Sequence, residues 1–136
     1  MSRRSRARSG PGPTSRPCTI ADARARLREA EAYLDAAQPV GDPEAIAANA
    51  IRAAMAAADA VCCVALRERS ADGSSLAAVG LLSRVDRSQS AALKRALDRQ
   101  TQAAYESREI SVSDAKMCLR QAALLLDAAR DRVLSA

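Results

Sequence analysis

The stretch from Ala53 to Leu66 is apolar on almost every side, and alanine is its most frequent residue. Alanine is the best helix former, because it loses almost no side-chain entropy on folding. The rest of the chain shares this bias: it has no Trp or Phe, and no segment alternates apolar and polar residues with a period of two. We therefore predict an all-α fold with residues 53–66 in the central, most buried helix.

Apolar spacing and capping residues predict five helices joined by short loops. The expected ranges are about 19–37, 43–69, a short helix from about 75, 88–106, and about 114 to the C-terminus. The expected N-caps are Thr19 (with Asp22 as its capping-box partner), Asp42, Ser74 or Ser75, and Ser113. Short loops favour an antiparallel bundle of four main helices and one short one.

The net charge of +5 comes entirely from the first 17 residues. They carry five arginines (Arg3, Arg4, Arg6, Arg8 and Arg16) and no acid, whereas residues 18–136 hold 16 basic and 16 acidic groups. Arg, Ser, Gly and Pro alternate in residues 1–17 without an apolar face, which predicts a disordered basic tail ahead of one domain at 18–136. The tail is either an arginine arm that touches phosphates or an extension without a role.

The four cysteines are Cys18, Cys62, Cys63 and Cys118, and the chain has no histidine. They form no CxxC pair, so we expect no metal site, and we expect small buried thiols in a reducing compartment. No charge-free apolar run reaches the roughly 18 residues of a membrane span. No glycine-rich phosphate loop of recognised spacing is present. We therefore expect a cytoplasmic protein with no cofactor and no membrane association.

Two residues depart from the alanine-rich pattern. Asp59 is the only charge between Ala53 and Leu66, and it shares a polar stripe with Asn49 and Arg52. A buried carboxylate without a partner costs several kcal/mol, so Asp59 needs a partner, either structural or functional. Gly80 lies within the third helix, where glycine costs about 1 kcal/mol relative to alanine. That cost suggests a close backbone approach, either inside the bundle or across a dimer.

Residues 49–82, NAIRAAMAAADAVCCVALRERSADGSSLAAVGLL, and residues 93–122, LKRALDRQTQAAYESREISVSDAKMCLRQA, carry a resemblance to a known family. Together with the run of helices, the chain resembles the HEPN superfamily over about 115 residues. This resemblance implies a helical bundle that is commonly dimeric. It also implies a link to RNA cleavage in toxin–antitoxin and defence systems.

The family signature is an arginine, four to six residues, and then a catalytic histidine. Here Arg69 is followed after five residues by Ser75. Histidine titrates near neutral pH and can act as a general base, whereas arginine stays protonated and serine is a poor base. The resemblance therefore marks Arg69, Ser75 and Asp59 as candidates of a degenerate catalytic motif. Arg67 joins Arg69 as a nucleic-acid contact, and Tyr105 could stack on a base.

These observations predict a catalytically degenerate HEPN-like module that associates with RNA or a nucleotide in a toxin–antitoxin or defence type system. Expected partners are a second copy of the chain and a cognate antitoxin or nucleotidyltransferase-type protein. The alternative is a non-catalytic helical dimerisation or protein-interaction module without a nucleic-acid role. Enzymatic activity stays open, and any activity would be that of a metal-independent endoribonuclease.

Overall fold

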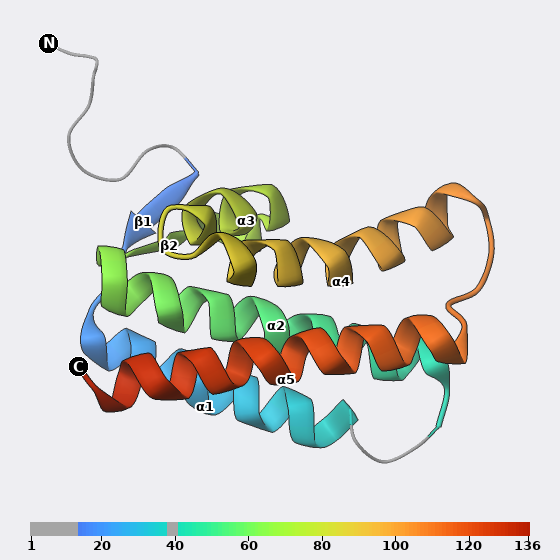
Figure 1. Cartoon of the computed structure of the whole chain (residues 1–136), viewed down its shortest axis with the longest axis horizontal. Helices are drawn as coiled ribbons and strands as arrows, with labels where there is room; N and C mark the ends of the chain where they lie inside the picture. Colours follow the sequence, from blue (N-terminus) through green and yellow to red (C-terminus); the bar gives the residue numbers. More distant parts are fainter. Residues whose placement is uncertain (1–13, 38–40) are drawn as a thin grey trace, which may run out of the picture.

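The computed structural model describes residues 14–37 and 41–136, and these ranges are almost entirely helical (Figure 1). The helices are α1 (Ile20–Ala37), α2 (Pro43–Leu66), α3 (Ser75–Ser83), α4 (Arg87–Tyr105) and α5 (Val112–Leu134). The remaining elements are the short strands β1 (Ser15–Pro17) and β2 (Glu68–Ser70) and a 3-10 turn, η1 (Ala71–Gly73). The all-α fold predicted from the sequence is confirmed.

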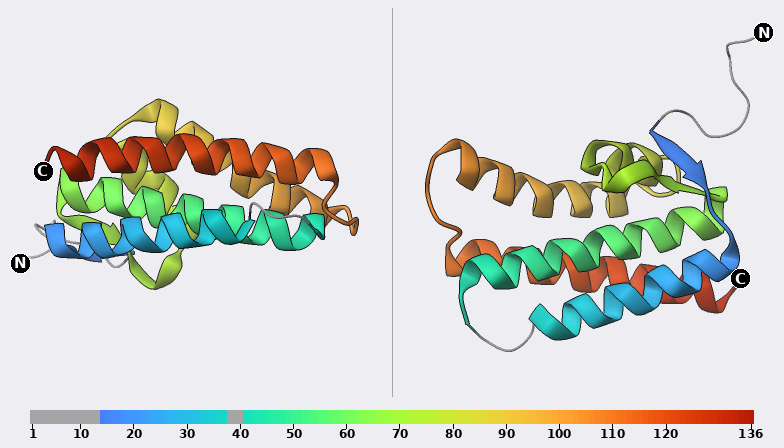
Figure 2. Two further views of the ribbon diagram at one scale, coloured as in Figure 1. Left: turned by 90° about the horizontal axis from the view of Figure 1, so that it is seen from below. Right: turned by 180° about the vertical axis from the view of Figure 1, so that it is seen from behind.

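The four long helices lie lengthwise beside one another, and the short α3 lies at one end, against the start of α4 (Figures 1 and 2). α2 packs against both α1 and α5, and α4 packs against α5 and α3. The buried residues of α2 are Ala47, Ala50, Ile51, Ala53, Ala54, Ala56, Ala57, Ala58, Asp59, Ala60, Val61, Cys62 and Cys63. The expectation that residues 53–66 form the most buried helix is therefore confirmed, apart from the last three residues.

Alanine contacts set the spacing of this core. Many of its members are alanines with no exposed surface, and the largest fully buried side chains include Leu82, Leu93 and Leu125. Small side chains let helix axes approach to about 8 Å. α2 can therefore be enclosed on several sides without any large aromatic residue.

Local side-chain chemistry sets most helix starts. The Thr19 hydroxyl accepts a hydrogen bond from the Asp22 amide, and Asp22 accepts one from the Thr19 amide, which completes the predicted capping box. Ser74 caps α3. The prediction of Ser113 for α5 is wrong. Ser111 is the N-cap, because Asp114 stands three residues later and closes a reciprocal capping box with it.

The end of α2 differs from the prediction of about Arg69. The helix ends at Leu66, and Arg67 adopts the left-handed conformation with φ 57°. A left-handed residue after the last turn is a common way to end a helix. The chain then continues as β2, which pairs with β1. Residues 15–17 therefore belong to the folded part of the chain, although the sequence placed them in a tail.

Cys18 and Cys63 form a disulfide with a Cα–Cα distance of 5.1 Å. The expectation of four free thiols is wrong for this pair, because the β1–β2 pairing brings Cys18 back onto the last turns of α2. Cys62 and Cys118 are free and buried, as expected. Burial raises the pKa of the Cys62 thiol to about 12 and that of Cys118 to about 11, so both are unreactive. Disulfides are typical of oxidising compartments, so the cytoplasmic location loses one of its grounds and stays a prediction.

Within the described residues, α2 is the one helix long and apolar enough to cross a membrane. However, 67% of its most apolar window is buried inside the fold. This burial is what the core helix of a globular protein shows, and it explains the length and composition of α2 without a bilayer.

Candidate functional site

The β1–β2 ribbon places two arginines opposite each other. The strands are antiparallel, and Arg16 is the register partner of Arg69. Backbone bonds extend the pairing at both ends: the Cys18 amide donates to the Arg67 carbonyl at 2.9 Å, and the Ala71 amide donates to the Thr14 carbonyl at 2.8 Å. Side chains directly opposite on an antiparallel pair lie on the same face. The two guanidinium groups are therefore held on one side of the ribbon.

Both arginines also line a cavity of about 280 Å³, which we call the arginine cavity. Its lining residues are Arg16, Arg26, Asp59, Arg69, Ser70 and Gly73. They come from β1, α1, α2, β2 and the end of η1, so only the folded chain assembles them. The volume falls just below the range of about 300–1,000 Å³ typical of pockets for drug-sized ligands. It suits a small anion such as a phosphate group.

Asp59 is the centre of a hydrogen-bond network at the floor of the cavity. Arg26 donates to Asp59 Oδ2 from Nε at 3.1 Å and from Nη2 at 2.8 Å, and Ser70 Oγ donates to Oδ1 at 3.2 Å. Arg26 Nη1 also donates to Glu29 at 3.0 Å. The sequence-based expectation that Asp59 has a partner is confirmed. Both of its carboxylate oxygens are engaged.

Opposing effects act on the pKa values of the two charged groups in this network. Burial raises the pKa of Asp59, and the Arg26 guanidinium and the Ser70 hydroxyl oppose that rise. Burial acts to lower the pKa of Arg26, but Asp59 and Glu29 outweigh it, so this pKa is raised. Arg26 and Asp59 thus neutralise each other. Arg16 and Arg69 remain as the net positive charge of the described lining.

The cavity can bind an anion, and none of its described side chains is free to act as a general base. A base must accept a proton from the substrate, and Asp59 already accepts three hydrogen bonds from Arg26 and Ser70. The chain has no histidine. Arginine and serine can only donate hydrogen bonds to a phosphate at neutral pH. The described lining therefore offers hydrogen-bond donors for an anion.

The structure brings two of the three predicted catalytic candidates together. Arg69 and Asp59 line the same cavity. Ser75 lies elsewhere: it starts α3 and lines a separate groove between α3 and α4. Arg69 and Ser75 therefore do not form one site, although their spacing in the sequence fits the motif. Arg67, the other predicted contact, donates from its guanidinium to the carbonyls of Cys63 and Val64 and caps α2.

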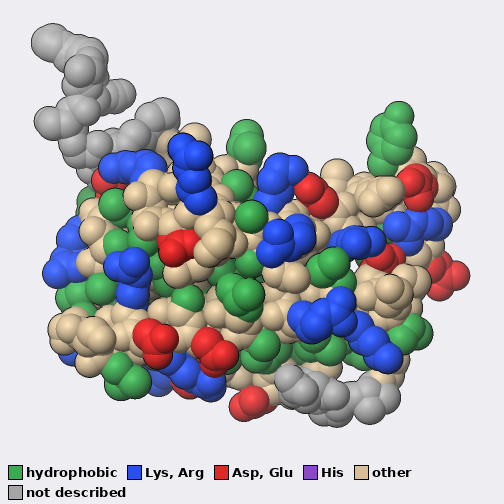
Figure 3. All heavy atoms as spheres, in the orientation of Figure 1, with side chains coloured by type: hydrophobic (Ala, Val, Ile, Leu, Met, Phe, Trp, Pro, Cys, Tyr) green, Lys and Arg blue, Asp and Glu red, His purple; other side chains and the backbone are tan. Residues whose placement is uncertain are grey.

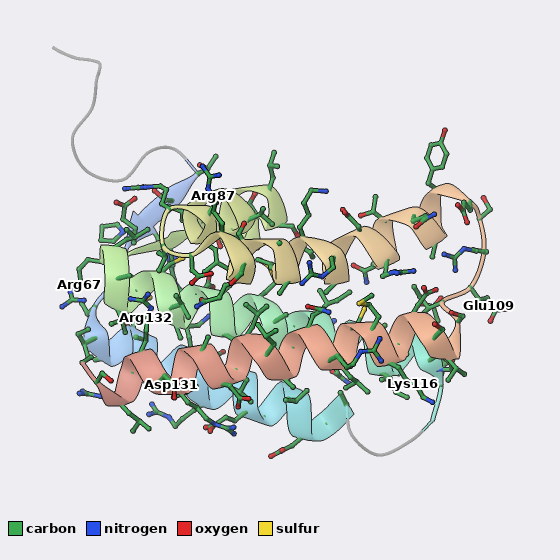
Figure 4. All side chains as sticks on the ribbon, in the orientation of Figure 1. Arg67, Arg87, Glu109, Lys116, Asp131 and Arg132 are labelled. Atoms are coloured by element: carbon green, nitrogen blue, oxygen red, sulfur yellow. A yellow bond between two sulfur atoms is a disulfide. The ribbon has the colours of Figure 1, made fainter. Side chains whose placement is uncertain are left out.

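The remaining predicted contacts do not reach the arginine cavity within the described residues. Tyr105 is the last residue of α4 and is 90% exposed, at the end of the molecule away from β2 (Figure 1). Figure 4 shows the same separation: Arg67 and Arg132 lie at the β2 end, and Glu109 lies at the opposite end. The tail arginines Arg3, Arg4, Arg6 and Arg8 lie outside the described residues.

Sequence reasoning missed Arg26, Ser70 and Arg16 as site residues. Arg26 had a usable signal, because it follows Ala23 by three residues and precedes Ala30 by four. Both alanines have no exposed surface, so this spacing turns Arg26 towards α2, where Asp59 needs a partner. Ser70 and Arg16 had no such signal, since they reach the cavity only through the β1–β2 pairing.

Among the residues that the structure describes, no group of three or more His, Cys, Asp or Glu side chains could hold a metal ion. No family model, no curated protein and no solved structure matches this chain.

Proposed function

We propose that this protein is an RNA- or nucleotide-associated module that binds phosphate groups in the arginine cavity and does not cleave RNA efficiently. The observation that carries the proposal is the placement of Arg16 directly opposite Arg69, with both residues in the lining of the arginine cavity. Like charges directly opposite on paired strands destabilise the pair. A bound anion relieves that repulsion and gains charge-assisted hydrogen bonds from both guanidinium groups.

The charge balance supports an anionic ligand. Among the side chains that the structure describes, which do not include that of Asp72, no ion pair involves Arg16 or Arg69, and Arg26 is neutralised by Asp59. Arginine suits phosphate because its planar fork donates two parallel hydrogen bonds to adjacent oxygens. The Ser70 hydroxyl donates to Asp59, and both residues line the cavity.

The HEPN-like ancestry and the toxin–antitoxin or defence setting belong to the same proposal and rest on the sequence resemblance. In that setting the protein acts with a second copy of itself and with an antitoxin or nucleotidyltransferase-type partner. A degenerate motif with Ser75 in place of histidine, and an Asp59 held by Arg26, favours RNA binding over turnover. Removal of a general base typically lowers a rate by 10²–10⁴-fold.

Binding of a fluorescein-labelled single-stranded RNA to Arg69→Ala tests the proposal. Hydrogen bonds to charged groups contribute about 1.5–3 kcal/mol, so we expect binding at least about tenfold weaker than wild type. The slope of log affinity against log salt should fall by about one. Arg120→Ala is the matched control, because Arg120 is exposed on α5 and does not line the cavity.

A chain lacking residues 1–13 separates the cavity from the tail, since it keeps Arg16 and removes Arg3, Arg4, Arg6 and Arg8. Binding that survives this deletion and is lost in Arg69→Ala supports the cavity. Binding that is equal in wild type, Arg69→Ala and Arg120→Ala, and that disappears on deletion of the tail, would contradict the proposal.

A second candidate is self-association through α3. Gly80 is exposed, and a Cβ built there would meet nothing within 4 Å, so packing inside the chain does not explain this glycine. Leu76, one turn earlier, is 85% exposed between grooves of about 270 and 340 Å³. Figure 3 shows apolar side chains projecting from the α3–α4 side.

A two-fold contact between antiparallel α3 helices would seat Leu76 of each copy beside Gly80 of the other. This makes a homodimer or protein-interaction module the alternative function. Sedimentation velocity of wild type and Leu76→Glu over a range of concentrations tests it. A monomeric wild type at the highest concentration would rule out the homodimer. A dimer that Leu76→Glu dissociates, with no RNA binding in either protein, would favour this function over the first.

A further inference from the structure

A second cavity adjoins the arginine cavity. It has a volume of about 240 Å³ and is lined by Arg26, Tyr33, Ile51, Arg52, Met55 and Gly73. The two cavities share Arg26 and Gly73 in their linings, so they lie next to each other. The first is polar and cationic, whereas the second presents an aromatic ring and two apolar side chains. We call it the Tyr33 cavity.

The helix geometry places both cavities along one groove between α1 and α2. Arg26 and Tyr33 are seven residues apart in α1, and Arg52 and Asp59 are seven apart in α2. Seven residues make two helical turns, so each pair shares a face and spans about 10 Å along its helix. This distance is comparable to the length of a mononucleotide from its phosphate to its base.

We propose that the Tyr33 cavity receives the base of the nucleotide whose phosphate lies in the arginine cavity. The inference rests on the proposed function, and it adds a base subsite with Tyr33 as the stacking residue. Tyr33 is half-buried against the core, so its ring is already held in place. Stacking of a base on the ring therefore costs little further conformational entropy. Ile51 and Met55 supply the apolar surface that a base covers, and Arg52 is exposed at the rim.

Stacking on tyrosine tolerates all four bases, because every base has a π face. The ligand class is therefore a nucleotide unit of any base, either free or within single-stranded RNA. The proposed stacking residue is therefore Tyr33, and not Tyr105 as predicted from the sequence. Tyr105 is 90% exposed at the far end of α4, whereas Tyr33 lies beside the cationic site.

The composition of the chain gives a direct probe of this ring. The protein has two Tyr and no Phe, Trp or His, so after exchange into D₂O its aromatic C–H signals come only from Tyr33 and Tyr105. Tyr105→Leu assigns the two sets of signals. We expect adenosine monophosphate and a single-stranded RNA hexamer to shift the Tyr33 ring protons through the ring current of the base. Ribose 5-phosphate, which lacks a base, should leave them nearly unchanged, and Tyr105 should not respond to any of the three.

Calorimetry on matched variants gives the energetic test. Tyr33→Leu keeps an apolar side chain against the core and should weaken binding of adenosine monophosphate at least about fivefold. It should leave binding of ribose 5-phosphate unchanged. Tyr105→Leu should leave both affinities at the wild-type value. Arg69→Ala should weaken both ligands, because it removes the phosphate contact.

The outcomes separate this inference from the proposed function. If Arg69→Ala weakens nucleotide and RNA binding but the Tyr33 signals do not shift at saturation, the base subsite is refuted and the phosphate site stands. The same holds if Tyr33→Leu binds adenosine monophosphate as wild type does. If neither the nucleotide nor the RNA binds the folded wild type, both ideas fail. Shifts with RNA alone support the subsite and restrict its ligand to RNA, and shifts with both extend it to free nucleotides.

Discussion

Arg26 and Asp59, 33 residues apart in sequence, are joined by two hydrogen bonds to a single carboxylate oxygen of Asp59, at 3.1 and 2.8 Å. The pair couples α1 to α2 beneath the arginine cavity, and the side chain of Asp59 is only 6% exposed. A buried ion pair adds little net stability, but loss of one partner leaves an uncompensated buried charge. The pair therefore sets how α1 docks on α2.

We predict that Arg26→Ala destabilises the protein by about 3–5 kcal/mol, because Asp59 then remains buried without its cation. Urea unfolding followed by circular dichroism measures this loss. Arg28→Ala is the control, since Arg28 is exposed on the same helix, and it should change stability by less than about 0.5 kcal/mol. A double variant that also carries Asp59→Asn should recover part of the loss. Equal effects of Arg26→Ala and Arg28→Ala would show that the pair is not a structural determinant.

The disulfide closes a loop between residues 45 positions apart. We predict that a reductant lowers the free energy of unfolding by about 2–4 kcal/mol, since the reduced unfolded chain regains conformational entropy. Urea unfolding with and without dithiothreitol measures the difference, and a thiol assay on denatured protein should count the two free cysteines before reduction. The Cys18→Ala/Cys63→Ala variant should be insensitive to reductant. Four reactive thiols in the untreated protein would contradict the disulfide.

The start of α5 offers a matched pair of serines. Ser111→Ala should lower the free energy of unfolding by about 1 kcal/mol. It removes the hydroxyl that accepts a hydrogen bond from the Asp114 amide at 3.0 Å. Ser113→Ala should be neutral or slightly stabilising, since this residue is exposed within the helix. Thermal unfolding of both variants compares them directly. A larger loss of stability for Ser113→Ala than for Ser111→Ala would show that Ser111 is not the N-cap.

Asp114 makes stability depend on pH in the acid range. Hydrogen bonds from Arg108 and Ser111 lower its pKa from 3.8 to about 2. A group whose pKa is lower in the folded state stabilises the fold above its unfolded pKa and loses that contribution as pH falls. We therefore expect the contribution of Asp114 to be complete above pH 3.8 and to decline towards pH 2. Urea unfolding of wild type and Asp114→Asn across this window tests the prediction. The free energy of unfolding should change less steeply with pH in the variant. Identical slopes would argue against it.

Gly80→Ala tests whether Gly80 lies in a contact between two copies of the chain. Alanine is favoured over glycine in a helix by about 0.5–1 kcal/mol, and the added Cβ meets nothing within 4 Å in this chain. We expect the monomer to become more stable by that amount in dilute solution. If a second copy packs on Gly80, the same substitution weakens association in sedimentation experiments. A destabilised dilute monomer would indicate that Gly80 has a packing role inside the chain.

Much of the secondary structure was predictable because its signals are local. The capping box of Thr19 and Asp22 and the Ser74 cap each involve residues three positions apart. The fifth helix shows the limit of such signals, since Ser111 and Ser113 both precede its apolar face. The choice depended on which serine could reciprocate with Asp114.

The candidate site was predictable only in part. Asp59 is the one charge in an apolar helical stretch, so the sequence shows that it needs a partner. The identity of that partner depends on how α1 packs against α2. Arg69 was placed at a helix end, whereas the left-handed Arg67 turns the chain into a strand and carries Arg69 towards Arg16. The disulfide was missed for the same reason, since Cys18 reaches Cys63 only through that strand pairing.

The sequence by itself determined that the chain is helical, that α2 is its core and that no histidine is available for acid–base chemistry. Helix propensity, apolar periodicity and residue type are properties of neighbouring positions, so they can be read along the chain. The tertiary structure alone decided that Arg16 and Arg69 line one cavity, that Tyr33 lines the neighbouring one, and that neither lining includes Ser75 or the exposed Tyr105. Proximity between distant segments arises from packing and strand register, because the free energy of burial selects one arrangement of helices that are individually compatible with several.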